Sequence, residues 1–349
     1  MKRAAYFNQF KKNTIILLFM CGAVSVLLRD IIGTFMIAVI IILNTLMEFA
    51  REIDPDCETT SPGCMGEQWS EVTLAKRSET TSPGGNLIEQ VFIKIEKYIL
   101  YIAAVICGFI TLLAIIRKEE LFTIFNLNTN FILALIPAGL PLAVTVTQTL
   151  GTRTIANHNL KRLLKYFLSC NTAIVLLMLT AALFSLPMPL EAVHILWINL
   201  IINSFPAITF NFDIKEKDSA VFKRVPEEII ARGTVVGISA FIIFASIYST
   251  GNDLLRARTS VFVFLAFSQL LYIFEFKFKK YDFLIIGMVF LTGILMLFII
   301  YIPAMQAMFK TNFLQKQDWL ILSGFILLNP ILNNCNKIVK ILLKKDGGN

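Results

Sequence analysis

Five neutral polar side chains interrupt stretches that are otherwise apolar enough to cross a membrane: Asn171, Asn199, Asn203, Ser268 and Gln269. Asn199 and Asn203 are four residues apart, so a helix would place them on one face. Such groups are costly in hydrocarbon and normally face a bundle interior or a water-filled path. Carboxamides can ligate a cation or form hydrogen bonds between helices. The pattern therefore indicates either an ion path or interhelical packing, and both interpretations stay open.

A run of helix-breaking residues supplies the second chemical signal. Pro137, Ala138, Gly139 and Pro141 lie in the middle of an apolar stretch and are followed by Thr145, Thr147 and Gln148. Proline removes a backbone donor, and a broken membrane helix is tolerated where it is buried in protein or lines a cavity. Pro206 predicts a similar interruption after Asn203. Two broken helices with polar groups favour a midplane site built from half-helix ends and freed carbonyls.

Composition decides the class of protein that must position these residues. The chain has 349 residues, of which 56% are hydrophobic and only 16% are charged, and this identifies an integral membrane protein. With about 20 apolar residues per crossing, we predict about ten transmembrane helices in an all-α bundle. The predicted spans are Ile15–Leu28, Ile31–Phe49, Tyr98–Ile116, Phe122–Leu150, Leu163–Leu186, Val193–Phe212, Val235–Tyr248, Val261–Phe276, Phe283–Ile302 and Leu320–Ile331.

The distribution of basic residues predicts the orientation. With ten spans, roughly 25 Lys and Arg fall on one side and roughly 7 on the other, and the basic side is expected to be cytosolic. Both termini are then cytosolic. The inner group includes four lysines near the end of the chain, at positions 337, 340, 344 and 345. A basic rim facing anionic membrane lipids accounts for the net charge of +8 without a nucleic-acid partner.

Three regions follow from the pattern. Residues 1–50 form a predicted transmembrane hairpin, 51–90 a short cytosolic linker, and 91–345 the main bundle. The linker contains the same hexapeptide twice, at Glu58–Gly63 and Glu79–Gly84. Each copy includes Ser-Pro, which is typical of a flexible turn and leaves phosphorylation or partner binding as an alternative.

Soluble catalytic chemistry is not indicated. The sequence lacks a phosphate-binding glycine loop, a zinc-protease helix, a nucleophile elbow and a dinucleotide fingerprint. We therefore predict no catalytic residue, no metal site, no cofactor and no nucleotide partner. His158 and His194 have no acidic or thiol partner nearby in sequence, and we expect both at the membrane boundaries.

Three motifs give the chain a recognisable resemblance. Leu135–Arg153 resembles the fourth membrane helix of P-type cation-transporting ATPases of the calcium-pump branch. Asn159–Asn171 looks like the start of the fifth helix of that family, and Leu196–Pro206 looks like its sixth. The resemblance implies a ten-helix bundle with broken fourth and sixth helices.

The departures from that family are as informative as the match. The segment between the second and third predicted helices is too short for the actuator domain of that family. The segment between the fourth and fifth is too short for its phosphorylation and nucleotide-binding domains, and the phosphorylated Asp motif is absent. The resemblance implies that the acidic ion-site positions of the family correspond here to neutral residues, namely Ala138, Ile174, Asn203 and Gln269. The resemblance thus implies a remnant ion pathway without carboxylates, formed by Pro137, Ala138, Gly139, Pro141, Asn171, Asn199, Asn203 and Gln269.

Four functional hypotheses remain at this stage. The first is a non-hydrolytic pseudo-pump that binds and regulates an intact cation pump or another membrane protein. The second is an ATP-independent cation channel or facilitator through the remnant site. A split pump with cytosolic domains on another chain and an inactive remnant are the other two. Beside all four stands the interpretation that the buried amides only hydrogen-bond between helices.

Overall fold

The computed structural model describes residue 38 and residues 83–135, 153–209, 225–276 and 283–346. Within those ranges the chain is helical and contains no strand. Four helices are long and apolar enough to cross a membrane, and a bent pair could supply a fifth span. The membrane class is thus confirmed, whereas ten spans are not confirmed. The predicted spans Ile15–Leu28 and Ile31–Phe49 lie outside the described residues, apart from residue 38.

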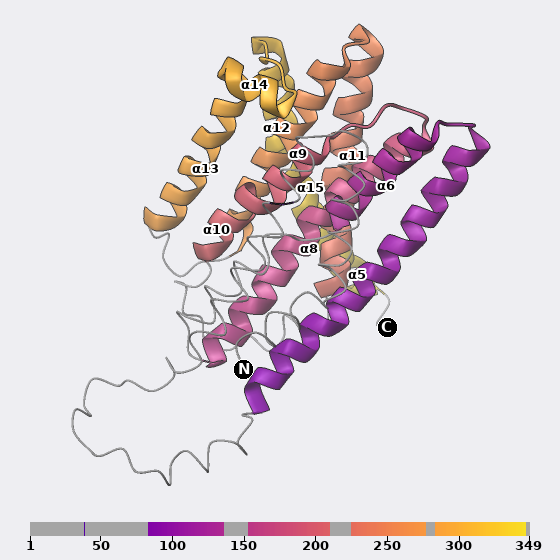
Figure 1. Ribbon diagram of the computed structural model, residues 1–349. Helices are drawn as coiled ribbons and strands as arrows, with labels where there is room; N and C mark the ends of the chain where they lie inside the picture. Colours follow the sequence, from indigo (N-terminus) through magenta and orange to yellow (C-terminus); the bar gives the residue numbers. More distant parts are fainter. Residues whose placement is uncertain (1–37, 39–82, 136–152, 210–224, 277–282, 347–349) are drawn as a thin grey trace, which may run out of the picture.

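The first described helices form the edge of the bundle. α5 (Pro83–Ile116) is followed by the shorter α6 (Leu121–Leu135), which packs beside it. Only 17% of the apolar span Lys97–Ile116 is buried, so most of that span faces away from the other helices. Figure 1 shows α5 along one side of the described helices. Leu133 and Ala134 of α6 are buried, and this places the end of α6 in the core.

Two helices at the centre approach each other closely. α8 (Arg153–Leu183) packs most extensively against α11 (Val225–Gly251). A Cβ added at Gly237 would lie 2.9 Å from the backbone oxygen of Ala173, and one at Gly233 would lie 2.5 Å from Thr172 Cγ2. Two glycines four residues apart therefore let the two helix backbones meet, as small residues do in membrane bundles.

The predicted sixth span has three parts. α9 (Ala192–Trp197) leads into the π-helical turn η2 (Ile198–Ile202), and α10 (Ser204–Ile208) follows. The backbone N–H of Asn203 donates to Ile198 O at 2.9 Å, and this bond to the fifth residue back is typical of a π turn. The structure shows a local change of helix type before Pro206, and a fully opened helix is not confirmed.

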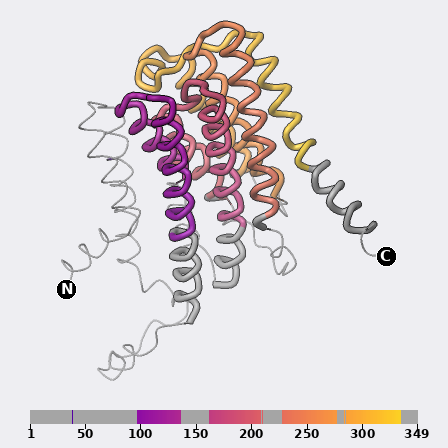
Figure 2. The backbone as a smooth tube through the Cα atoms, turned by 90° about the vertical axis from the view of Figure 1, so that its right-hand side faces the viewer, coloured from indigo at the N-terminus to yellow at the C-terminus, as the bar shows by residue number. Residues whose placement is uncertain are grey.

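The remaining helices complete the bundle. α12 (Leu254–Tyr272), extended by the 3₁₀ turn η5 (Ile273–Glu275), is the most deeply buried span, at 78%. α13 (Phe283–Tyr301) and α14 (Pro303–Phe309) meet at a bend of 89°. α15 (Lys316–Asp346) packs against α11 and α12. Figure 2 shows these helices side by side, with the yellow part of α15 along one edge.

Candidate functional site

Three predicted amides meet at the end of α6. Asn171 Nδ2, from α8, donates to Leu135 O at 3.4 Å, and Asn199 Nδ2, from η2, donates to Leu133 O at 3.4 Å. Asn203 Nδ2 donates to Asn199 Oδ1, also at 3.4 Å. All three asparagines are buried. Tertiary structure therefore brings Asn171 of α8 and the η2 segment, with Asn199 and Asn203, to the last carbonyls of α6.

This amide cluster, defined as Asn171, Asn199 and Asn203, is neutral and incompletely satisfied. Asn171 Oδ1 and Asn203 Oδ1 are buried without a hydrogen-bond partner among the residues that the structure describes. Ser204 Oγ donates to Asn199 O at 3.3 Å and so satisfies one carbonyl beside the π turn. Leaving a buried acceptor unsatisfied costs about 1–3 kcal/mol. Oxygens of this kind suit a weakly bound cation or water better than tight divalent binding, which needs compensating negative charge.

Several predicted residues are not tested by this geometry. Pro137, Ala138, Gly139 and Pro141 lie outside the described residues, as do Thr145, Thr147 and Gln148. The chain enters that stretch directly after Leu135, next to the amide cluster. The predicted break at Pro137 therefore stays a prediction.

Gln269 is buried on α12 without a described bond to the amide cluster. Gln269 is 2% exposed, and within the described part of the chain neither its Oε1 nor its Nε2 has a hydrogen-bond partner. Its backbone oxygen accepts from Tyr166 OH at 3.2 Å. The predicted grouping of Gln269 with the three asparagines is thus not seen among the described hydrogen bonds.

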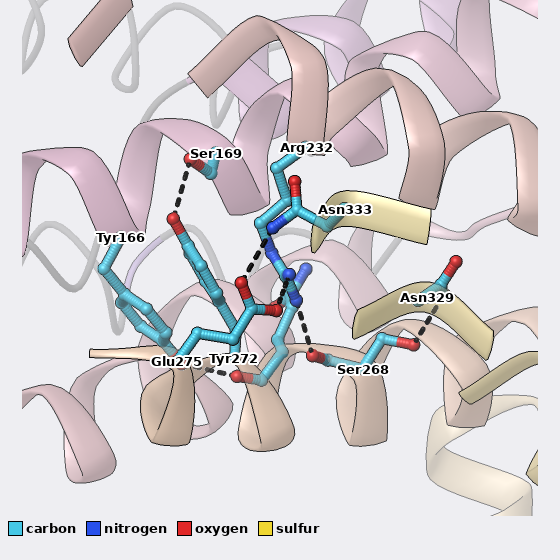
Figure 3. Close-up of polar contacts among 9 residues, drawn as sticks. Tyr166, Ser169, Arg232, Ser268, Tyr272, Glu275, Asn329 and Asn333 are labelled. Atoms are coloured by element: carbon cyan, nitrogen blue, oxygen red, sulfur yellow. Dashed lines mark hydrogen bonds and ion pairs between the residues drawn. The ribbon is translucent and has the colours of Figure 1, made fainter. Parts of the chain in front are cut away.

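A charged network surrounds the same part of α12. Arg232 of α11 forms a buried ion pair with Glu275, and Arg232 Nη2 donates to Ser268 O at 3.3 Å (Figure 3). The guanidinium carbon lies 3.6 Å from the centroid of the Tyr272 ring. Asn333 Nδ2 of α15 donates to Glu275 Oε2 at 2.7 Å. The positive and the negative charge are each held by more than one contact, as a charge buried in a membrane bundle requires.

The network continues along α15 by one helical turn. Asn329 Nδ2 donates to Ser268 Oγ at 3.5 Å, and Ser239 Oγ of α11 donates to Asn329 Oδ1 at 3.1 Å. Asn329 and Asn333 are four residues apart and share a helix face, so both reach the interface with α11 and α12. Three helices are joined by polar contacts that apolar packing alone would not specify.

Aromatic rings connect this network to α8. Tyr166 stacks on Tyr272 with centroids 5.5 Å apart, and Ser169 Oγ lies 3.4 Å from Tyr272 OH. We call Arg232, Ser268, Glu275, Asn329 and Asn333 the α12 clamp. Its geometry holds helices in register and offers no activated nucleophile. The described residues also contain no group of three or more His, Cys, Asp or Glu side chains that could hold a metal.

A second set of contacts lies at the other end of α12. Arg256 Nη2 lies 2.6 Å from Oδ1 of the fully buried Asp318, and Arg258 pairs with Glu191. These bonds tie the start of α12 to α15 and to the loop before α9. The span predicted over Val261–Phe276 extends from Leu254 to Glu275 in the structure and so includes the arginines at 256 and 258.

His194 is fully buried within this second set of contacts, so its side chain packs inside the protein, and its predicted position at the membrane boundary stays a prediction. The Glu191 amide donates to His194 Nδ1 at 3.2 Å, and His194 Nε2 lies 2.6 Å from Phe309 O. Because Nδ1 accepts, the ring proton must sit on Nε2 and point at the carbonyl. The ring also stacks on Phe262 with centroids 4.5 Å apart, so His194 anchors α9 to its neighbours.

Sequence reasoning missed the α12 clamp. Arg232 was counted only as an inner-side charge, and Glu275, Asn329 and Asn333 were not singled out. One signal was available: two asparagines four residues apart in an apolar run predict a polar stripe on one helix face. The pairing of Arg232 with Glu275, 43 residues later, has no local signature.

Comparison with known proteins supports the resemblance found in the motifs. Residues 187–339 match the family described as cation transporting ATPase, C-terminus. The chain is 30% identical over 189 residues to the calcium-transporting ATPase of Bacillus subtilis (strain 168), covering 48% of this chain and 21% of that protein. It is 31% identical over 225 residues to calcium-transporting ATPase 1 of Bacillus cereus, covering 54% and 25%.

A mammalian relative matches to a similar extent. Calcium-transporting ATPase type 2C member 2 of Homo sapiens is 29% identical over 209 residues, which cover 52% of this chain and 22% of that protein. The chain thus spans about a fifth to a quarter of the length of these curated relatives. The C-terminal part of the chain is homologous to the membrane region of calcium-transporting ATPases, and the predicted resemblance is confirmed there.

Proposed function

We propose that the chain is a non-hydrolytic, pump-like membrane protein that binds and regulates an intact cation pump or another membrane protein. The observation that carries this proposal is the amide cluster: Asn171, Asn199 and Asn203 meet where a pump would be expected to hold its cation, and no carboxylate is among them. A bundle that keeps its packing without a charged site can still offer a surface to a partner.

The chain also leaves little room for a motor inside the bundle. Residues 136–152 alone separate α6 from α8, where the family places its phosphorylation and nucleotide-binding domains. Coupling to ATP by the family mechanism needs the phosphorylated Asp motif, which the sequence lacks. We therefore propose no ATPase activity for this chain, although its relatives are named calcium-transporting ATPases.

The topology belongs to the same proposal. A hairpin over 1–50, a cytosolic linker over 51–90 and a bundle over 91–345, with both termini cytosolic, would present the linker to a cytosolic face of the partner. The Arg232–Glu275 and Lys165–Glu228 ion pairs lie near ends of α11, α12 and α8 that the basic residues predict to be inside.

Two measurements test the binding function. Purified protein should show no vanadate-sensitive ATP hydrolysis, and such activity in the isolated chain would contradict the motorless proposal. A membrane pump should co-purify with the full chain in mild detergent and be lost when residues 51–86 are replaced by Gly and Ser. Retention of the partner by that variant would exclude the linker as the contact, and absence of any pump in both samples would contradict regulation of a pump.

A second candidate is an ATP-independent cation channel or facilitator through the remnant site. The unsatisfied Asn171 Oδ1 and Asn203 Oδ1 favour it, because conduction needs binding weak enough to release the ion. Buried Ile174 and Ile202 oppose it, since they add apolar volume to the same helices. Ion flux into proteoliposomes without ATP should fall in Asn203→Leu; flux that is absent from folded wild-type protein, or unchanged in the variant, would remove this candidate.

A further inference from the structure

α6 carries polar side chains that the amide cluster does not include. Thr123, Asn126 and Asn130 recur at spacings of three and four residues, so they share one side of the helix. The same register continues to Leu133, which is 1% exposed and whose backbone oxygen accepts from Asn199. This side of α6 therefore leads toward η2, and α6 packs against α9 directly before that segment.

These side chains lack the hydrogen bonds that polar groups inside a membrane protein normally make. Asn130 is 8% exposed and Asn126 is half-buried, and neither side chain bonds another residue that the structure describes. Thr129 is 9% exposed, and its Oγ1 is buried without a partner in the described part of the chain. Asn128 donates to Thr111 of α5, but its Oδ1 is left open in the same way. We call Thr123, Asn126, Thr129 and Asn130 the α6 polar face.

The Thr129 hydroxyl differs from those of other threonines in the described helices. Four of these donate Oγ1 to the backbone oxygen four residues earlier, namely Thr172, Thr180, Thr259 and Thr292. That bond satisfies a hydroxyl within its own helix, and Thr129 does not form it. A bound water molecule or ion is the usual explanation for a buried group left open in a native structure.

The α6 polar face lies between one end of the bundle and the amide cluster. α6 begins at Leu121, directly after the exposed turn Arg117–Glu120. From Leu121 to Leu133 the helix rises about 18 Å, and the polar face supplies a hydroxyl or an amide at each turn of this distance. α6 contains no charged residue. A neutral lining of this kind suits a weakly held monovalent cation better than a divalent one, which needs compensating negative charge.

We propose that the α6 polar face is a hydrated path by which small monovalent cations reach the amide cluster from the end of the bundle where α6 begins. The basic residues predict that this end is outside. The hydroxyl and amide oxygens replace part of the water around the ion, and the absence of charge on α6 lets the ion leave again. The inference rests on the cation pathway given above as the second candidate function, to which it adds the side of entry, the lining and the class of ion.

Silver ions test the path, because Ag⁺ is a small monovalent cation that binds thiols. In proteoliposomes of known orientation, Ag⁺ added at the end where α6 begins should protect the thiols of Asn126→Cys and Thr129→Cys from alkylation after unfolding. Mass spectrometry reads each of these thiols separately from the native cysteines. Protection should be at least about tenfold faster than in two controls, the fully buried Ala240→Cys and the outward-facing Ile102→Cys of α5, because hydrocarbon strongly disfavours a cation.

The outcomes separate the path from the function on which it rests. Thiols at 126 and 129 that are protected no faster than the two controls would overturn the path, even if the wild-type protein conducts ions. In that case the facilitator would stand and its ions would enter elsewhere. Rapid protection at both positions would support the path, and if wild-type flux were absent at the same time, the facilitator alone would be removed.

Discussion

Replacing one partner of the Arg232–Glu275 pair should lower the free energy of unfolding far more than replacing both partners. The Arg232 and Glu275 side chains are only 5% and 14% exposed, so neither charge can regain much hydration when its partner is lost. Removing one partner of a buried pair costs about 3–5 kcal/mol, whereas replacing both with apolar residues is often close to neutral. We expect Arg232→Leu to fall in that range, because the buried Glu275 carboxylate would then lose the cation that pairs with it.

The double variant provides the decisive comparison. Arg232→Leu with Glu275→Leu should lie within about 2 kcal/mol of the wild type, giving a coupling free energy of about 3 kcal/mol or more. Reversible unfolding in mixed micelles, followed by helical circular dichroism, measures the four proteins. Lys165→Leu is the matched control, since the Lys165–Glu228 pair at the same end has side chains 19% and 33% exposed and should contribute about 1 kcal/mol or less.

Two outcomes would refute this reasoning. If each single variant lowers the free energy of unfolding by less than about 1 kcal/mol, water reaches the pair and hydrates the remaining charge. A double variant as unstable as the sum of the singles would show that each side chain acts through packing, with no coupling between the charges.

Three further predictions use the same unfolding measurement. Gly237→Ala should destabilise by about 1–3 kcal/mol because its Cβ would meet backbone of α8, whereas Gly287→Ala, with open space around it, should be neutral or slightly stabilising; equal effects would contradict the close approach. Gln269→Leu should stabilise by about 1 kcal/mol, since both polar atoms of the amide are buried without partners; a loss of stability would show that the amide is satisfied by a bound molecule. His194→Phe should destabilise by about 1–3 kcal/mol, because two backbone groups lose their hydrogen bonds; an unchanged protein would mean that the ring acts by stacking alone.

The sequence predicted the local features of the fold well. Long apolar runs identified the membrane class and the cores of α5, α8, α11 and α12, because hydrocarbon demands apolar side chains at every depth. The motif around Asn199 lies within residues 187–339, and the family match over those residues confirms the resemblance there. The pattern located the helix limits less closely: the span predicted over Val235–Tyr248 extends over Glu227–Gly251 in the structure.

What only the tertiary structure decided was which polar groups meet. Asn171, Asn199 and Asn203 were predicted individually, and their gathering at the end of α6 depends on how α8 and η2 pack against it. Arg232 can lie inside a membrane helix because Glu275, 43 residues later, pairs with it and the backbone oxygen of Ser268 accepts a second hydrogen bond from it. Sequence fixes which side chains carry the cost of burial, but compensation depends on distances between residues far apart in the chain, and packing alone sets those distances.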